Sequence, residues 1–102
     1  MQTQGVKTFN DLNRIPVKQL VRSSSSVAAN FSSATRGRSE AEFYSKICIV
    51  TEECDECLFW IGYLLDTGII HISETKALQN EADELLRIFS SIKKKLRLKR
   101  PQ

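Results

Sequence analysis

Apolar side chains recur along most of the chain at alternating steps of four and three residues. In the segment that begins at Ser39, this stripe consists of Phe43, Ile47, Val50, Cys54, Cys57, Ile61 and Leu64. After a short loop the same spacing resumes, in Leu78, Ala82, Leu85, Phe89, Ile92 and Leu96. Such a period gives each of two helices one apolar stripe, with which it packs lengthwise against its neighbours.

The ends of these two helices carry residues that commonly cap helices. Ser39 and Glu42 match a capping box, in which the serine hydroxyl accepts from the amide of residue 42 and the glutamate reaches back. Gly68 suits the left-handed conformation that closes a helix, and Ser73 suits the N-cap of the next one. We therefore predict helices over residues 39–66 and 74–98.

The serine-rich stretch 22–39, RSSSSVAANFSSATRGRS, has the composition of a flexible linker but keeps the helical rhythm. The four-three positions here are Leu20, Ser24, Val27, Phe31 and Ala34. On this buried stripe Ser24 would let two helices approach closely, while its hydroxyl bonds back to the preceding turn. The periodicity favours a helix over residues 17–34, with Gly37 breaking the chain before the next helix.

Chain length and composition determine the expected architecture. The 102 residues suffice for one hydrophobic core but not for two, so we expect a single domain over residues 1–102. With 41% apolar residues, four glycines and two prolines, the chain is too apolar for disorder and too poor in breakers for a β-rich fold. Residues 1–16 leave room only for a short stub or partial helix. The predicted fold is all-α, an up-and-down helical bundle of the four-helix type with a shortened first helix.

The sequence also indicates a cellular compartment. No apolar run reaches the roughly 18 residues of a membrane span, and the first residues, MQTQGVKTF, lack the apolar segment of a secretory signal. The three cysteines, an odd number, are typical of reduced thiols rather than of a disulfide framework. We expect a cytoplasmic protein without a membrane partner.

The residues do not form a recognisable catalytic or metal-binding motif. His71, the single histidine, has no nucleophile or carboxylate at a characteristic spacing. Cys54 and Cys57 have the spacing of a metal or redox pair, but they fall within a helical stripe and lack a second pair to complete four ligands. We expect them to act as small apolar residues, and we predict no enzyme activity, no cofactor and no metal site.

Charge is distributed unevenly along the chain. Residues 1–39 carry six basic and one acidic side chain, residues 40–84 two and eleven, and residues 85–102 seven and none. The candidate nucleic-acid-binding residues are Arg36, Arg38, Lys93, Lys94, Lys95, Arg97, Lys99 and Arg100. The alternatives are pairing with the chain's own acids and, for the C-terminal group, stabilisation of a helix end. Because no aromatic residues are interleaved with these cations, binding should follow the phosphate backbone of RNA or DNA.

A second face of the 39–66 helix combines apolar and acidic side chains away from the apolar stripe. Its residues are Ile49, Glu53, Glu56, Trp60 and Tyr63. This face is either solvated or a subunit contact, in which Trp60 anchors and a glutamate meets an arginine of a neighbouring copy.

Four sequence features together resemble a known family. They are Arg22, Ser26, Ala29 and Asn30 in the first long helix, G-R-S-x-x-E-F at 37–43, the acidic patch 52–56, and L-L-x-x-G-I at 64–69. From about Gln19 onwards the chain resembles the bacterial four-helix-bundle proteins first noted in intervening sequences of large-subunit ribosomal RNA genes. That family is similar in fold to the accessory variability protein of diversity-generating retroelements. The resemblance implies a homopentamer that binds nucleic acid and a reverse transcriptase.

In one respect the chain departs from this family, whose members usually begin with a complete helix. Here only Thr8 to Arg14 could fill that place, which would leave apolar stripe residues exposed and favours a homo-oligomer.

Two functions stay open on sequence grounds. One is an oligomeric nucleic-acid-binding protein, RNA-associated or accessory to a reverse transcriptase; the other is a helical protein-interaction scaffold with no role in nucleic-acid binding.

Overall fold

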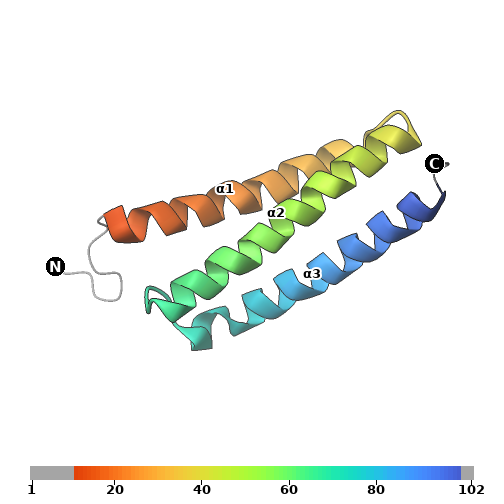
Figure 1. The fold of residues 1–102 in the computed structure, drawn as a ribbon. Coiled ribbons are helices and arrows are strands. Elements are labelled where there is room, and N and C mark those ends of the chain that lie inside the picture. Colours follow the sequence, from red (N-terminus) through yellow and green to blue (C-terminus); the bar gives the residue numbers. More distant parts are fainter. Residues whose placement is uncertain (1–10, 100–102) are drawn as a thin grey trace.

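Three long helices, each antiparallel to the next, make up the described part of the chain. The structure is a computed structural model and describes residues 11–99, apart from the side chains of residues 11, 12, 72 and 74. The helices are α1 (Asp11–Ala34), α2 (Glu40–Asp66) and α3 (Ile72–Lys99). They form a rod of 58 × 20 × 20 Å in which α2 lies between α1 and α3 (Figure 1). Over residues 11–99 the predicted all-α, up-and-down arrangement is confirmed, with three helices and not the four of the predicted type.

The apolar stripe of α2 forms the centre of the bundle because α2 packs against both neighbours. Six of its seven predicted members are buried: Ile47, Val50, Cys54, Cys57, Ile61 and Leu64. Phe89 of α3 completes a cluster with Val50 and Cys54. This stripe excludes water along most of the rod and provides the main hydrophobic stabilisation.

Both ends of α2 are closed by the predicted caps, one of them in a modified form. The Ser39 hydroxyl accepts from the amide of Glu42 at 3.1 Å, and the Glu42 carboxylate accepts from the amide of Arg38 at 2.7 Å. At the other end, Gly68 has φ 78°, and the amide of Ile69 donates to the carbonyl of Leu64 at 3.0 Å. This is the left-handed closure that glycine favours.

The first helix begins earlier than predicted and runs through the proline. The helix predicted over residues 17–34 extends further at its start, because α1 is continuous from Asp11 to Ala34. Pro16 removes one backbone donor and crowds the carbonyl four residues before it, so the disturbance stays within the first turn and a half of the helix. The rest of the predicted N-terminal stub, residues 1–10, lies outside the described residues. The third helix likewise begins at Ile72 and contains Ser73, the predicted N-cap.

The serine-rich stretch is helical, as predicted, but the buried serine is Ser23 and not Ser24. Ser23 is 0% exposed and faces α2, whereas Ser24 is exposed. The backbone of α1 lies close to α2 and not to α3, so the line along which α1 contacts α2 is rotated toward Ser23, while Phe31 of the predicted stripe reaches Phe89 of α3. The Ser24 hydroxyl still donates to the carbonyl of Val21 at 3.1 Å, as expected for a serine within a helix.

The rotated contact leaves an apolar groove between α1 and α3, with α2 as its floor. A cavity of about 360 Å³ is lined by Leu20, Val21, Ser24, Val27, Cys54, Cys57, Ile61, Leu78, Glu81, Ala82 and Leu85. Val21 and Leu78 on its walls are half exposed. The predicted stripes of α1 and α3 are therefore only partly covered by the described residues.

Candidate nucleic-acid interface

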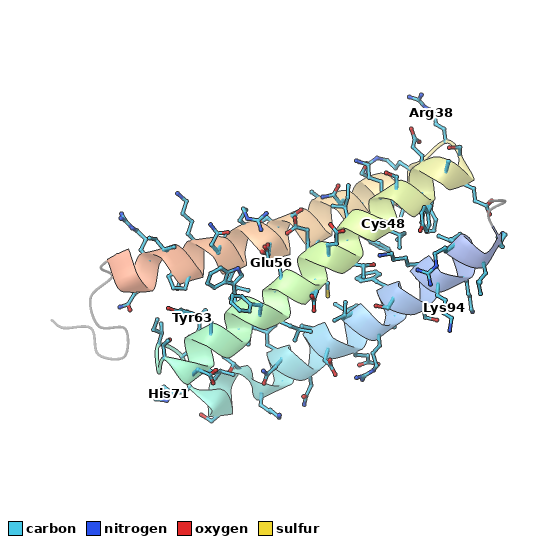
Figure 2. All side chains as sticks on the ribbon, in the orientation of Figure 1. Arg38, Cys48, Glu56, Tyr63, His71 and Lys94 are labelled. Atoms are coloured by element: carbon cyan, nitrogen blue, oxygen red, sulfur yellow. The ribbon has the colours of Figure 1, made fainter. Side chains whose placement is uncertain are left out.

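The fold brings the two basic clusters of the sequence to one end of the rod. The turn that carries Arg36 and Arg38 joins α1 to α2, and α3 ends beside that turn (Figure 1). Lys99 Nζ lies 2.7 Å from Glu40 Oε2, an ion pair between residues 59 positions apart. In Figure 2, Arg38 and Lys94 both lie toward this end, whereas His71 lies at the other.

We call this region, residues 32–46 and 93–99, the basic end. It contains eight basic side chains and two acidic ones, Glu40 and Glu42. The basic residues are Arg36, Arg38, Lys46, Lys93, Lys94, Lys95, Arg97 and Lys99. By contrast, residues 52–84 carry nine acidic side chains and one basic one. The rod therefore has a strongly positive end, a distribution that attracts polyanions.

Most cations of the basic end are not neutralised by the chain's own acids. Within residues 11–99, Lys99 pairs with Glu40, but Arg36, Arg38 and Lys46 have no ion-pair partner. Arg36 donates instead to the hydroxyl of Ser32 at 2.8 Å. Pairing with the chain's own acids, the alternative weighed from the sequence, thus applies to Lys99 and not to the two arginines of the turn.

A polar hollow of about 340 Å³ lies at the α1–α2 turn, lined by Ser33, Arg36, Gly37, Arg38, Glu42 and Lys46. Gly37 keeps the hollow open, since a Cβ there would lie 3.2 Å from the carbonyl oxygen of Ala34 and 3.5 Å from Glu42 Oε1. The sequence analysis missed Lys46. Its position one helical turn after Glu42 could have identified it, because residues four apart lie on the same side of a helix.

The lysines of α3 lie beside its apolar stripe without belonging to it. Ile92 and Leu96 are half-buried, as is Lys93, whereas Lys94 and Lys95 are exposed. Arg97 and Lys99 lie in the last turn of the helix, where they also favour the negative helix end. Arg100, the last predicted residue of this cluster, lies outside the described residues.

The predicted aromatic and acidic face of α2 divides into two parts. Phe59, Trp60 and Tyr63 form a ring cluster, with centroids 4.8 Å apart for Phe59 and Trp60 and 5.6 Å apart for Trp60 and Tyr63. Phe59, which the sequence analysis did not select, is 60% exposed, and Tyr63 is 42% exposed. The remaining residues of this face are Ile49, which is intermediate, and the two glutamates, Glu53 and Glu56, which face α1. A subunit contact through this face stays a prediction.

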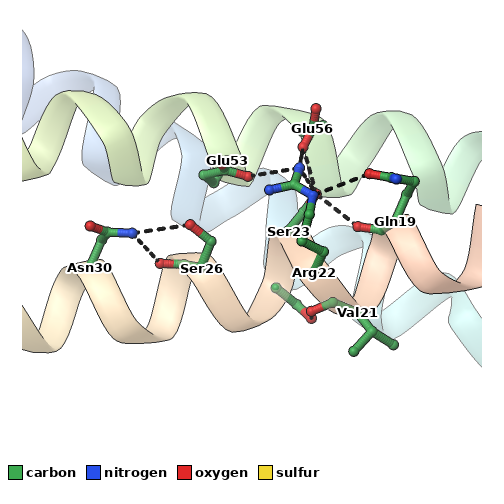
Figure 3. A network of polar contacts seen from close by, with 9 residues as sticks. Gln19, Val21, Arg22, Ser23, Ser26, Asn30, Glu53 and Glu56 are labelled. Carbon is green, nitrogen blue, oxygen red and sulfur yellow. Dashed lines mark hydrogen bonds and ion pairs between the residues drawn. The ribbon is translucent and has the colours of Figure 1, made fainter.

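The arginine that meets the two glutamates comes from the same chain. Arg22 of α1 forms ion pairs with Glu56 and, at 3.3 Å, with Glu53 (Figure 3). The Ser23 hydroxyl lies 2.7 Å from Glu56 Oε1 and 3.0 Å from the carbonyl of Gln19. The hydrogen bond from Ser23, assisted by the charge of Arg22 and opposed by partial desolvation, holds the pKa of Glu56 below its usual range. This network fixes the register of α1 on α2.

The three cysteines of α2 are free, and Cys54 and Cys57 are buried, which agrees with the apolar role predicted for these two, whereas Cys48 is half-buried. Burial raises the pKa of the Cys54 thiol and raises that of Cys57 to about 11, so both stay protonated near neutral pH. Over the described residues there is no group of three or more metal-ligating side chains. None of the helices in residues 11–99 is both long and apolar enough to cross a membrane.

Comparisons with known proteins support a specific family. The chain matches the family model described as 23S rRNA-intervening sequence protein over residues 7–91. It is also similar to a solved structure from Bacteroides thetaiotaomicron, described as a protein with unknown function from the S23 ribosomal protein family. The two chains are 30% identical with a TM-score of 0.74, and the match covers 78% of this chain and 74% of that one. No curated protein matches this chain.

Proposed function

Because the chain belongs to the 23S rRNA-intervening sequence protein family, we propose that it is a non-enzymatic, RNA-associated protein that binds the phosphate backbone of RNA or DNA. The observation that carries the proposal is the basic end, where two clusters far apart in the sequence meet. The family description refers to ribosomal RNA, which favours RNA as the partner.

Family membership confirms the resemblance found in the sequence. The similarity to the retroelement accessory protein, with its pentamer and its reverse-transcriptase partner, stays a prediction, because neither comparison bears on it.

The chemistry of the basic end favours contacts with phosphate groups over contacts with bases. Lysine and arginine neutralise phosphates and release condensed counterions, which gives affinity without sequence preference. Lys94 and Lys95 are exposed, and none of the three lysines of α3 has an ion-pair partner within residues 11–99. They are therefore free to meet a polyanion at low structural cost.

A salt series tests this proposal. We would measure the binding of a fluorescent single-stranded RNA and of a DNA duplex for the parent and for Lys93→Gln/Lys94→Gln/Lys95→Gln. Each lost phosphate contact should flatten the log-log salt slope by about 0.7 for the single strand and about 0.9 for the duplex.

The matched control is Arg14→Gln/Lys18→Gln/Lys76→Gln, which removes the same charge from exposed positions away from the basic end. This control should keep the parent's slope. Equal slopes for the parent and the lysine variant would contradict binding through the basic end.

We further propose that the protein is a homo-oligomer, since Val21, Leu78 and Phe59 leave apolar surface exposed. Burial of this surface in an assembly would stabilise it, and repetition of the basic end would add weak phosphate contacts together. Light scattering should give a mass several times that of the chain, five times for the predicted pentamer. A monomer at working concentrations contradicts this part of the proposal.

The apolar groove between α1 and α3 favours one alternative, a helical protein-interaction scaffold. Such grooves accept the apolar face of an amphipathic helix. The two functions differ in the salt series, because for a scaffold the lysine variant and the charge-matched control should show the same salt slope.

A further inference from the structure

The hollow at the α1–α2 turn differs in its geometry from the lysines of α3. Arg36 and Arg38 come from the turn, and Lys46 comes from the second turn of α2, so cations from two segments line the same hollow. The lysines of α3 instead follow one another along a helix. Cations spread around a helix suit the successive phosphodiesters of a strand, whereas cations that line one hollow suit one compact anion.

The charge of the hollow indicates which anion it would hold. Three cations and the carboxylate of Glu42 line it, which leaves a net charge of +2. A phosphodiester within a nucleic acid carries a single negative charge. A terminal phosphate monoester carries about −1.5 to −2 at neutral pH and presents three strong acceptor oxygens.

The bonds inside the hollow leave the cations available. Glu42 Oε1 accepts from the amide of Arg38 at 2.7 Å, so this carboxylate is held by the backbone and not by Lys46. The hydroxyl of Ser39 accepts from the amide of Glu42, so the N-terminus of α2 is capped by a side chain of the protein itself. An anion here would therefore be held by side chains, chiefly by the guanidinium groups and the Lys46 ammonium.

From this geometry we propose that the hollow is a binding site for the terminal phosphate of an RNA strand, with Arg36, Arg38 and Lys46 as its ligands. The inference rests on the proposed function and deepens it. The α3 lysines bind phosphodiesters in any part of the strand, and the hollow adds a preference for strand ends that carry a phosphate.

The test uses one RNA sequence in three forms, with a 5′-phosphate, a 3′-phosphate or hydroxyl groups at both ends, and with an internal fluorophore. For the parent, one phosphorylated form should bind about threefold to fivefold more tightly than the hydroxyl form, as expected for an ion pair at a solvent-open site. Lys46→Gln and Arg36→Gln/Arg38→Gln should abolish this ratio. Lys46→Arg should keep it, because the charge is retained.

The lysine variant of α3 provides the matched control. Lys93→Gln/Lys94→Gln/Lys95→Gln should weaken all three RNAs in parallel and leave the ratio unchanged. Equal binding of the three RNAs by the parent, or a ratio that survives the loss of the hollow's cations, overturns the terminal-phosphate site alone. Failure of the parent to bind any of the three overturns the proposed function, and the site with it.

Discussion

Ile47 and Lys46 are neighbours in the sequence, yet they belong to two regions of the molecule with opposite physical roles. Ile47 is fully buried in the apolar stripe of α2, and Lys46 lines the polar hollow at the basic end. Stability comes mainly from the stripe, where removal from water is worth about 25 cal/mol per Å² of apolar surface. At the basic end, Lys99 pairs with Glu40, while Arg36, Arg38 and Lys46 have no ion-pair partner within residues 11–99.

Because the two regions have different roles, the stability of the protein and its affinity for a polyanion can be changed separately. A substitution in the stripe should lower stability without changing the affinity of the folded molecules. A substitution of an unpaired cation should change affinity with little effect on stability, because surface changes away from special features usually stay within about 0.5 kcal/mol.

The largest effect is expected for Ile47→Ala, which leaves a cavity at a site that is 0% exposed. We expect a loss of about 2–5 kcal/mol in the free energy of unfolding. Urea denaturation followed by circular dichroism measures it. Lys46→Gln, the neighbouring substitution, serves as the control and should unfold within about 0.5 kcal/mol of the parent. A comparable loss in both variants would remove the distinction between the two regions.

An intermediate effect is expected for Ser39→Ala, because Ser39 lies in the basic end and caps α2. Its hydroxyl accepts from the amide of Glu42, so its loss leaves a helix N-terminus uncapped. We expect about 1 kcal/mol of destabilisation. Thermal unfolding of Ser39→Ala, Ser39→Asp and the parent checks this, and the aspartate should restore most of the loss. An alanine variant as stable as the parent would show that the cap is dispensable.

The sequence predicted those parts of the fold that depend on local periodicity and capping. The stripe of α2 was correct because α2 has a helix on two sides, so nearly every four-three position is covered. The buried serine of α1 was placed at Ser24 instead of Ser23 because the backbone of α1 lies close to α2 alone. Its rotation about its own axis depends on the partner helix, and the pattern of α1 alone does not contain that information.

The candidate site was predicted as two separate basic clusters, and their meeting could not be deduced from the sequence. It follows from the up-down-up order of three helices of similar length, which places the end of α3 beside the α1–α2 turn. Lys46 was missed because it is a single cation in an acidic segment. The partner of Glu53 and Glu56 was expected in another copy, since nothing in the sequence indicates that Arg22 lies opposite them.

The smallest effect is expected for Glu56→Gln, which tests a charged contact outside the basic end. The folded pKa of Glu56 is lowered, mainly by the hydrogen bond from Ser23 and the charge of Arg22. An acid with a lowered folded pKa stabilises the fold above its unfolded pKa, about 4.3, and this contribution is lost as the pH falls through the folded value.

The melting temperature of Glu56→Gln should therefore lie slightly below that of the parent at neutral pH. The difference should shrink as the pH falls below about 4.3, where the carboxyl of the unfolded chain takes up a proton, and should be lost as the pH falls through the lower folded pKa. Glu52→Gln, one turn earlier on the same helix and exposed, removes the same charge without the contacts to Ser23 and Arg22, and should melt close to the parent's temperature at neutral pH. A difference for Glu56→Gln that is constant from neutral to acid pH would mean that packing, and not the ionised contact with α1, accounts for the stabilisation.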